Sequence, residues 1–410
     1  MQAAEQTKTW ILRLLGLAAF FLPVFQPVSI VSFLLLFIVR FSDARERAVM
    51  SRLIRTRKML WPPVLFFSLH LLGLLWTENF KYAGLDLQIK APFLLLPFIA
   101  GTMWISERES RQILLAFVSG CLLSSMILLV NAFMHFSTGA SYTVFFYIDY
   151  SSLLMHPTYL SMYMGLAILF LFYLMQKEEH AGRLKFYSAA ILFLFIQLIL
   201  LSARTAEAVA FLVFVLAGFF YLREGALLLK RRMHFAAILL FTLISYLFLQ
   251  DLNNRFSQVE KVISHDLVKE DTPAYNSTSG RIEIWKESLE ILKENWLWGT
   301  GTGDIKDELI RTYERHHFTY ALEKKLNAHN QFLQSWLALG LAGLITLCLI
   351  FAPPLFQFRR QTDTLMALFT LSLLLNAMTE SILEVQKGVL VCVFFYSILI
   401  SCSAQKSPST

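Results

Sequence analysis

Residues 111–136, RQILLAFVSGCLLSSMILLVNAFMHF, decide the class of protein to which this chain belongs. No acidic or basic side chain interrupts the run between Arg111 and His135. A helix needs roughly 20 apolar residues to cross the hydrocarbon core of a bilayer, and runs of roughly 17–25 recur along the chain between short charged clusters. They are too long and unbroken for the alternating strands of an outer-membrane barrel. The pattern predicts an all-α polytopic membrane protein.

The composition agrees with this prediction. Of the 410 residues, 56% are hydrophobic and only 16% are charged, whereas a soluble protein carries about 25% charged residues. We therefore attribute the net charge of +7 to basic residues that set the orientation of the chain in the membrane, and we expect no nucleic-acid partner. The four cysteines lie within or at the end of apolar segments without metal-binding spacing, which predicts packing roles; they are Cys121, Cys348, Cys392 and Cys402.

We predict about twelve transmembrane helices, since this number of apolar runs has the required length. The first run follows Lys8 but has no small-residue cleavage site after it, so we expect an uncleaved helix rather than a signal peptide. The expected spans are residues 10–25, 27–40, 59–76, 86–104, 111–136, 156–175, 185–202, 204–222, 233–250, 330–351, 362–379 and 386–402.

The basic residues of the short loops predict the orientation, because lysine and arginine gather in cytoplasmic loops. They follow the second, sixth, eighth and tenth expected spans, at 40–58, 177–185, 223–232 and 359–360. An even number of spans with this bias places both termini in the cytoplasm. The chain then divides into 1–250 with the first nine expected helices, an outer loop domain at 251–329, and 330–410 with the last three helices and a cytoplasmic tail.

The outer loop contains two expected helices around a glycine-rich turn. SGRIEIWKESLEILKEN (279–295) predicts an amphipathic helix capped by Ser279, and 304–325 predicts a second, charged helix. GTGTGD (299–304) lies between them. It follows no strand and lacks the lysine of a phosphate-binding loop, so we predict a helix-breaking turn whose amides are available to line a ligand cavity.

Two arginines are candidate anion ligands. Arg204 lies between two apolar runs on the outer side, where basic residues are scarce, and ionisable groups at membrane depth are functional candidates. Ser202 stands beside it. The alternative is an interfacial arginine that extends to lipid headgroups. Arg281 lies in the first turn of the amphipathic helix, where an anion would bind both guanidinium and free amides; its alternative is a surface pair with Glu283 or Glu287.

His329 is the candidate base. It precedes Asn330 at the outer mouth of an expected span, and histidine is the usual side chain for moving a proton from a hydroxyl near neutral pH. The alternative is the polar end of a helix. Glu380 and Glu384 flank an outer turn and could orient a cation. The rival histidines are His156, His316 and His317.

Two segments resemble the signature region of the O-antigen ligase and O-antigen polymerase superfamily: SGRIEIWKESLEILKENWLWGTGTGD (279–304) and AHNQFLQSWLALGLAGL (328–344). In that family an arginine–tryptophan helix precedes a glycine-rich turn, and a histidine–asparagine pair opens the next membrane helix. LLSARTA (200–206) resembles its Ser/Arg stretch, with threonine where relatives commonly carry glycine. HPTYLSMY (156–163) and TESILE (379–384) resemble motifs of some members.

The resemblance implies a GT-C-like fold in the bacterial inner membrane, with the active site facing the periplasm. The implied donor is a glycan on undecaprenyl diphosphate, and the implied acceptor is a sugar hydroxyl, which is lipid A–core for a ligase. Arg204 and Arg281 would hold the diphosphate and His329 would be the base in a single inverting displacement, without metal or other cofactor. The residues that would contact the substrates are Ser202, Asn330, His156, Tyr159 and Glu380.

The sequence is also compatible with other functions. A polysaccharide polymerase or a protein O-oligosaccharyltransferase of the same superfamily would share the donor and differ in the acceptor. A transporter or lipid flippase would be expected to show related halves and polar or broken helices near the midplane. The polar candidates gather instead at the outer surface, beside one long loop, which favours a transferase.

Overall fold

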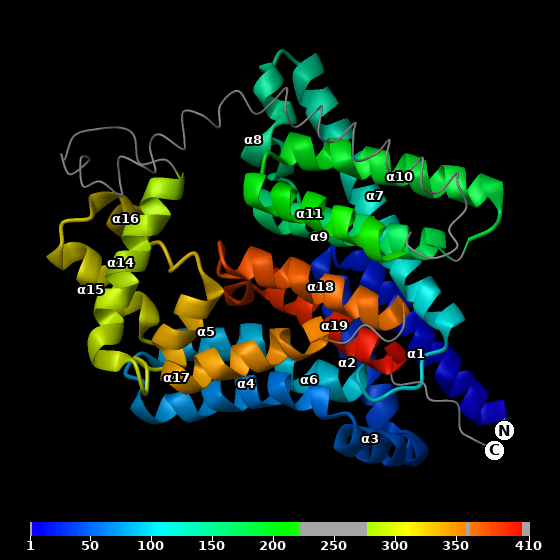
Figure 1. Ribbon diagram of the computed structural model, residues 1–410, viewed down its shortest axis with the longest axis horizontal. Coiled ribbons are helices and arrows are strands. Elements are labelled where there is room, and N and C mark those ends of the chain that lie inside the picture. The colour runs from blue at the N-terminus through cyan, green and yellow to red at the C-terminus, as the bar shows by residue number, and fades with distance from the viewer. Residues whose placement is uncertain (1, 177, 222–276, 357–360, 404–410) are drawn as a thin grey trace.

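The computed structural model describes residues 2–176, 178–221, 277–356 and 361–403, and every regular element in these ranges is a helix (Figure 1). The first part holds α1 (Gln2–Phe21), α2 (Gln26–Ser42), α3 (Ala44–Thr56), η1 (Lys58–Leu60), α4 (Trp61–Leu72), η2 (Gly73–Trp76), α5 (Phe80–Lys90), α6 (Pro92–Ile99) and α7 (Glu107–Ser137). The middle holds η3 (Tyr142–Phe145), α8 (Tyr147–Ser151), α9 (Pro157–Gln176), α10 (Ala181–Leu201) and α11 (Arg204–Tyr221). The last part holds α14 (Ser277–Asn295), α15 (Ile305–Arg315), α16 (Thr319–Lys324), α17 (Gln331–Phe351), η5 (Pro353–Phe356), α18 (Gln361–Ala377), η6 (Ile382–Glu384) and α19 (Gln386–Ser403).

Within the described ranges, 6 helices are long and apolar enough to cross a membrane. They are Lys58–Trp76, α7, α9, α10, α11 and Gln331–Phe356, which fall on six of the expected spans. α2 and α3 together form a pair bent by 101°, a broken span or a re-entrant loop. The chain is therefore a polytopic helical membrane protein, and the number of twelve spans stays a prediction.

One expected span differs in the structure, and another lies outside the described residues. The expected span 86–104 is not one helix, because α5 ends at Lys90 and α6 begins at Pro92, whose ring removes a backbone donor and breaks the helical ladder. The expected span 233–250 lies outside the described residues, as do residues 251–276 of the outer loop. The basic residues Lys177, Arg223, Lys230, Arg231, Arg232, Arg359 and Arg360 also lie outside them.

The centre of the bundle is α9. Its apolar window is 94% buried, because α7, α10, α11, α18 and α19 all contact it. A helix that is apolar on all sides, as α9 is, suits such a central position. Phe170 of α9 packs on Phe117 of α7 and Phe395 of α19, with ring centroids 5.8 and 4.9 Å apart. The core therefore joins segments that are far apart in the chain.

The glycine-rich turn fits into a break in α17. Gly340 has φ 61° and ψ −154°, so the helical hydrogen bonds fail there. The freed carbonyls of Leu337 and Ala338 accept from the amides of Thr300 (2.7 Å) and Gly301 (3.1 Å). Broken helices at membrane depth require such replacement partners. GTGTGD is thus a structural turn that completes α17.

α14, α15 and α16 lie together at the left of Figure 1 and are called the outer unit after the predicted outer loop; their apolar core also includes Leu337 and Leu339 of α17. α14 begins at Ser277, so Ser279 lies inside the helix rather than at its N-cap, and Arg281 lies in the second turn. The expected helix 304–325 is two helices, because the chain turns between them at His317, whose φ is 53°. In Figure 1, α1 begins and α19 ends at the opposite side of the molecule.

Candidate functional site

Four separate parts of the chain meet at the end of the bundle where α9 and α17 begin. His329 stands two residues before the start of α17, and Glu380 lies in the turn that follows α18. Arg281 projects from α14. His156 immediately precedes α9. The hydrogen bonds and charge interactions described below connect these four side chains.

The His329–Glu380 pair is the centre of this cluster. Nδ1 of His329 lies 3.2 Å from each carboxylate oxygen of Glu380. Because a carboxylate only accepts hydrogen bonds, the neutral imidazole donates through Nδ1 and keeps its lone pair on Nε2. The ring is about one-quarter exposed, at 23%, so Nε2 is able to meet a substrate. The pair therefore has the geometry of an oriented general base.

The backbone at His329 is unusual and is held on both sides. Its φ of 44° lies in the left-handed region, which few residues other than glycine adopt. The His329 amide donates to Oδ1 of Asn327 (3.0 Å), and Oδ1 of Asn330 accepts from the amides of Phe332 (2.9 Å) and Leu333 (3.1 Å). Asn330 is thus the N-cap of α17, and only its Nδ2 is left for the predicted substrate contact. Strained backbone of this kind persists where the surroundings fix it.

Glu380 also faces a cation. Nη2 of Arg281 lies 3.6 Å from Oε2 of Glu380, so Arg281 pairs with Glu380 and not with Glu283 or Glu287. Burial raises the pKa of Glu380, but the hydrogen bond and charge of His329, followed by the charge of Arg281, hold that pKa below its usual range. Glu380 is therefore ionised near neutral pH and links the base to the arginine.

His156 and Tyr159 border the same cluster from α9. Their ring centroids lie 6.4 Å apart. Burial lowers the pKa of His156, the charge of Glu380 raises it, and the charge of His329 lowers it again, with a net shift below the usual value. These charge interactions place His156 near both members of the His329–Glu380 pair. The structure thus brings together five of the residues predicted from sequence.

Arg204 and Ser202 lie at the end of the bundle where α9 begins, because α10 follows α9 in the chain and runs back along it (Figure 1). Arg204 is the exposed first residue of α11, with Glu207 as a charged neighbour. Ser202 ends α10 in a left-handed conformation and donates from Oγ to the carbonyl of Ile199 (3.1 Å). Contact of either residue with a diphosphate stays a prediction.

Sequence reasoning missed Lys90 and Gln331. Lys90 is only 1% exposed, and its Nζ lies 3.1 and 3.2 Å from the two carboxylate oxygens of Glu384. Gln331 is fully buried and donates to Glu384 as well (3.1 Å). The sequence offered one signal for Lys90: it lies inside the expected span 86–104, and ionisable residues within membrane segments are rare.

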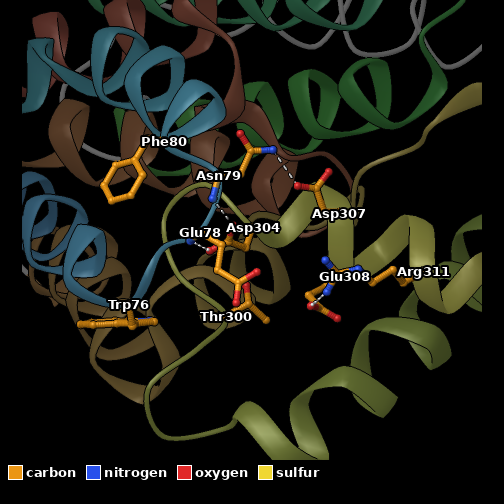
Figure 2. Close-up of a pocket in the computed structure, with 9 residues that line it drawn as sticks. All are labelled: Trp76, Glu78, Asn79, Phe80, Thr300, Asp304, Asp307, Glu308 and Arg311. Atoms are coloured by element: carbon orange, nitrogen blue, oxygen red, sulfur yellow. Dashed lines mark hydrogen bonds and ion pairs between the residues drawn. The ribbon is translucent and has the colours of Figure 1, made fainter.

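A separate cavity of about 390 Å³ lies between α15 and the segment that joins η2 to α5 (Figure 2). Asp304 accepts there from the amides of Glu78 (2.9 Å) and Asn79 (2.7 Å), which fixes the start of α5. Thr300 and Asp304 of the GTGTGD turn line this cavity, whereas none of the predicted catalytic or substrate-binding residues does. The described residues contain no group of three or more histidine, cysteine or carboxylate side chains suited to a metal ion. Its lining residues are Trp76, Glu78, Asn79, Phe80, Thr300, Asp304, Asp307, Glu308 and Arg311.

Two comparisons with known proteins give matches to part of this chain. Residues 189–348 match the family model described as O-antigen ligase, and this range includes Arg204, Arg281 and His329. An uncharacterized protein of Haemophilus influenzae is 28% identical over 88 residues, which is 22% of this chain and 22% of that protein. The match thus spans about a fifth of the relative's length. The family match covers the segments that carry the candidate base and arginines, and it supports a relationship of this chain to the O-antigen ligase and O-antigen polymerase superfamily.

Proposed function

We propose that this protein is an O-antigen ligase-type glycosyltransferase with a GT-C-like fold. It transfers a glycan from undecaprenyl diphosphate to a sugar hydroxyl of lipid A–core at the periplasmic face of the inner membrane. The observation that supports the proposal best is the His329–Glu380 pair, with Nδ1 of His329 3.2 Å from both carboxylate oxygens. The pair lies beside Arg281, whose guanidinium is a suitable ligand for an anionic leaving group.

The proposed reaction is a single displacement. Nε2 of His329 accepts the proton of the acceptor hydroxyl while that oxygen forms a bond to the anomeric carbon. The bond between this carbon and the diphosphate oxygen breaks, and undecaprenyl diphosphate leaves with the electron pair, so the anomeric centre is inverted. Glu380 stabilises the imidazolium that forms, as a carboxylate does when it orients a histidine base.

Arg281 and Arg204 are the proposed ligands of the diphosphate. At 3.6 Å, the pairing of Arg281 with Glu380 is longer than a close charge-assisted hydrogen bond. A diphosphate carries more charge than one carboxylate and would draw the guanidinium toward itself. When the donor is bound, Arg281 would no longer offset the negative charge of Glu380, and that charge would stabilise protonated His329. Guanidinium groups bind phosphate oxygens in bidentate geometry and would stabilise the leaving group without a metal.

The first test uses purified protein, an undecaprenyl-diphosphate glycan and lipid A–core in the presence of EDTA. We expect transfer to continue in EDTA and to fall about 10²–10⁴-fold in His329→Ala. Arg281→Ala and Arg204→Ala should each lower kcat about 10²-fold. The matched controls are His135→Ala, an exposed histidine at the end of α7, and Arg311→Ala, an exposed arginine on α15. Full transfer by all three site variants would refute the assignment.

The product distinguishes the related activities. Complemented cells should make lipopolysaccharide capped with O-antigen if the acceptor is lipid A–core. Longer glycans that stay on the lipid carrier would indicate a polymerase, and glycosylated protein would indicate an O-oligosaccharyltransferase. Movement of the donor across the membrane without a new glycosidic bond would indicate a transporter or flippase.

A further inference from the structure

A clamp of three side chains, Lys90, Gln331 and Glu384, joins the segments that carry His329 and Glu380. Lys90 ends α5, Glu384 ends η6 in the turn after Glu380, and Gln331 is the first residue of α17. Lys90 is 1% exposed and Gln331 is 0% exposed, whereas the Glu384 side chain is 16% exposed. The clamp therefore connects three parts of the chain through two buried side chains and one partly buried carboxylate.

Gln331 uses both of its N–H donors and its carbonyl oxygen in hydrogen bonds around the clamp. Its Nε2 donates to Oε1 of Glu384 and to Oγ of Ser335, each at 3.1 Å. Its Oε1 accepts from the amide of Leu383 at 2.7 Å. A fully satisfied buried amide fixes the relative position of the groups that it joins. The start of α17 is thereby held against the turn that follows α18.

Lys90 supplies the charge that allows Glu384 to take this position. Its Nζ contacts both carboxylate oxygens of Glu384 and one oxygen of Asp86. A buried carboxylate without a cation is costly, and it either takes up a proton or moves toward water. Without Lys90, Glu384 would no longer hold Gln331 in the same geometry.

We propose that Lys90 is a positioning residue for the His329–Glu380 pair and acts through Glu384 and Gln331. Gln331 is close in sequence to His329, and Glu384 is one turn of chain from Glu380. The clamp fixes the distance between these two segments, and with it the position of Nδ1 between the carboxylate oxygens. As a role in catalysis, this inference rests on the proposed function.

The clamp also sets the charge around His329. Glu380 contacts the imidazole, Arg281 pairs with Glu380, and His156 interacts with both Glu380 and His329. Glu384 lies in the same turn as Glu380, and Lys90 offsets part of the negative charge of Glu384 and Asp86. Replacing Lys90 with a neutral residue leaves an additional negative charge near the imidazole, which favours the imidazolium.

The experiment compares the full-length protein with Lys90→Met and with the double variant Lys90→Met/Glu384→Gln in lipid nanodiscs. The rate at which diethyl pyrocarbonate modifies His329, measured by peptide mass spectrometry across pH, gives the titration midpoint without any transfer reaction. We expect Lys90→Met to raise this midpoint by roughly 0.5–1 pH unit, and the double variant to return it toward the original value. In the transfer assay, Lys90→Met should lower kcat about 10-fold or more with little change in the donor KM. Lys81→Met, an exposed lysine of the same helix, should change neither quantity.

A folded Lys90→Met protein with unchanged midpoint and unchanged kcat would overturn the proposal. If Lys90→Met does not fold, Gln331→Leu keeps both charges but breaks the connection, and an unchanged kcat in that variant would also overturn it. His329→Ala separates the two proposals. Normal transfer by His329→Ala, together with the shifted midpoint in Lys90→Met, would refute the proposed base and retain the clamp.

Discussion

His329 combines an uncommon backbone conformation with a defined hydrogen-bond partner. The left-handed φ of 44° turns the chain sharply before α17, and Asn327 and Asn330 hold the turn from either side. Glu380 accepts from Nδ1 and so directs Nε2 outward. Together these contacts fix the orientation of the His329 ring. A base that accepts a proton from a hydroxyl needs such a fixed orientation.

Glu380→Gln should lower kcat about 10²–10⁴-fold, because the imidazolium loses its counter-ion and the amide is able to favour the wrong tautomer. Steady-state kinetics with a fixed glycan donor would measure the change. Glu283→Gln on α14, which removes a carboxylate paired with Lys286, is the control. A kcat unaffected by Glu380→Gln would exclude the oriented-base arrangement.

The same variant has a predictable effect on stability. Since the pKa of folded Glu380 lies below its unfolded value, the carboxylate stabilises the fold above the unfolded pKa of about 4.3, and this contribution disappears as pH falls through the folded pKa. Thermal unfolding should therefore separate the original protein from Glu380→Gln at pH 6–7 and bring them together at strongly acidic pH.

At the scale of the elements, the break in α17 and the turn that fills it depend on each other. Thr300 and Gly301 replace the hydrogen bonds that Gly340 interrupts, and the amide of Leu341 donates to the carbonyl of Leu297 (3.2 Å). The outer unit is thereby tied to a membrane helix through backbone contacts. This connection fixes α14, and with it Arg281, relative to the start of α17.

Gly340→Ala should destabilise the protein by roughly 2 kcal/mol or more, because the position combines positive φ with a backbone contact. An added Cβ would lie 2.0 Å from the carbonyl oxygen of Leu297. Gly84→Ala is the matched control, since a Cβ there meets nothing within 4 Å and alanine favours the helix. Fluorescence-detected thermal unfolding should show a clear loss for the first variant only. Equal stability of the two would contradict the described junction.

For the whole molecule, the outer unit and the start of α1 lie at opposite sides. α14–α16 lie at one side of Figure 1, while α1 begins and α3 lies near the other. α3 carries several arginines, which is typical of a cytoplasmic segment. The arrangement suits a protein that receives lipid-linked substrates at one membrane face.

Cysteine labelling would test this orientation in a background without the native cysteines. His317→Cys, between α15 and α16, should react with a membrane-impermeant maleimide in intact spheroplasts. Arg45→Cys on α3 should react only after permeabilisation, because the positive-inside rule places it in the cytoplasm. Both positions are exposed, so access to the reagent is comparable. Labelling of both in intact spheroplasts, or of Arg45→Cys alone, would contradict the topology.

The sequence by itself determined the class of protein and the chemistry of the main candidates. The lengths of apolar runs are local properties, and so are the glycine-rich turn and the motifs around Arg281 and His329. The break between α5 and α6 was missed, although Pro92 marks it, because the surrounding residues are apolar throughout.

Only the tertiary structure decided which polar groups pair. His329 and Glu380 are 51 positions apart, and Lys90 and Glu384 are 294 positions apart. The local sequence does not show which of these residues pair, because a buried cation is stabilised by any carboxylate that packs against it. Packing around α9 and α17 brings particular partners within hydrogen-bond distance, and in an interior of low dielectric that proximity determines whether a charge is stabilised.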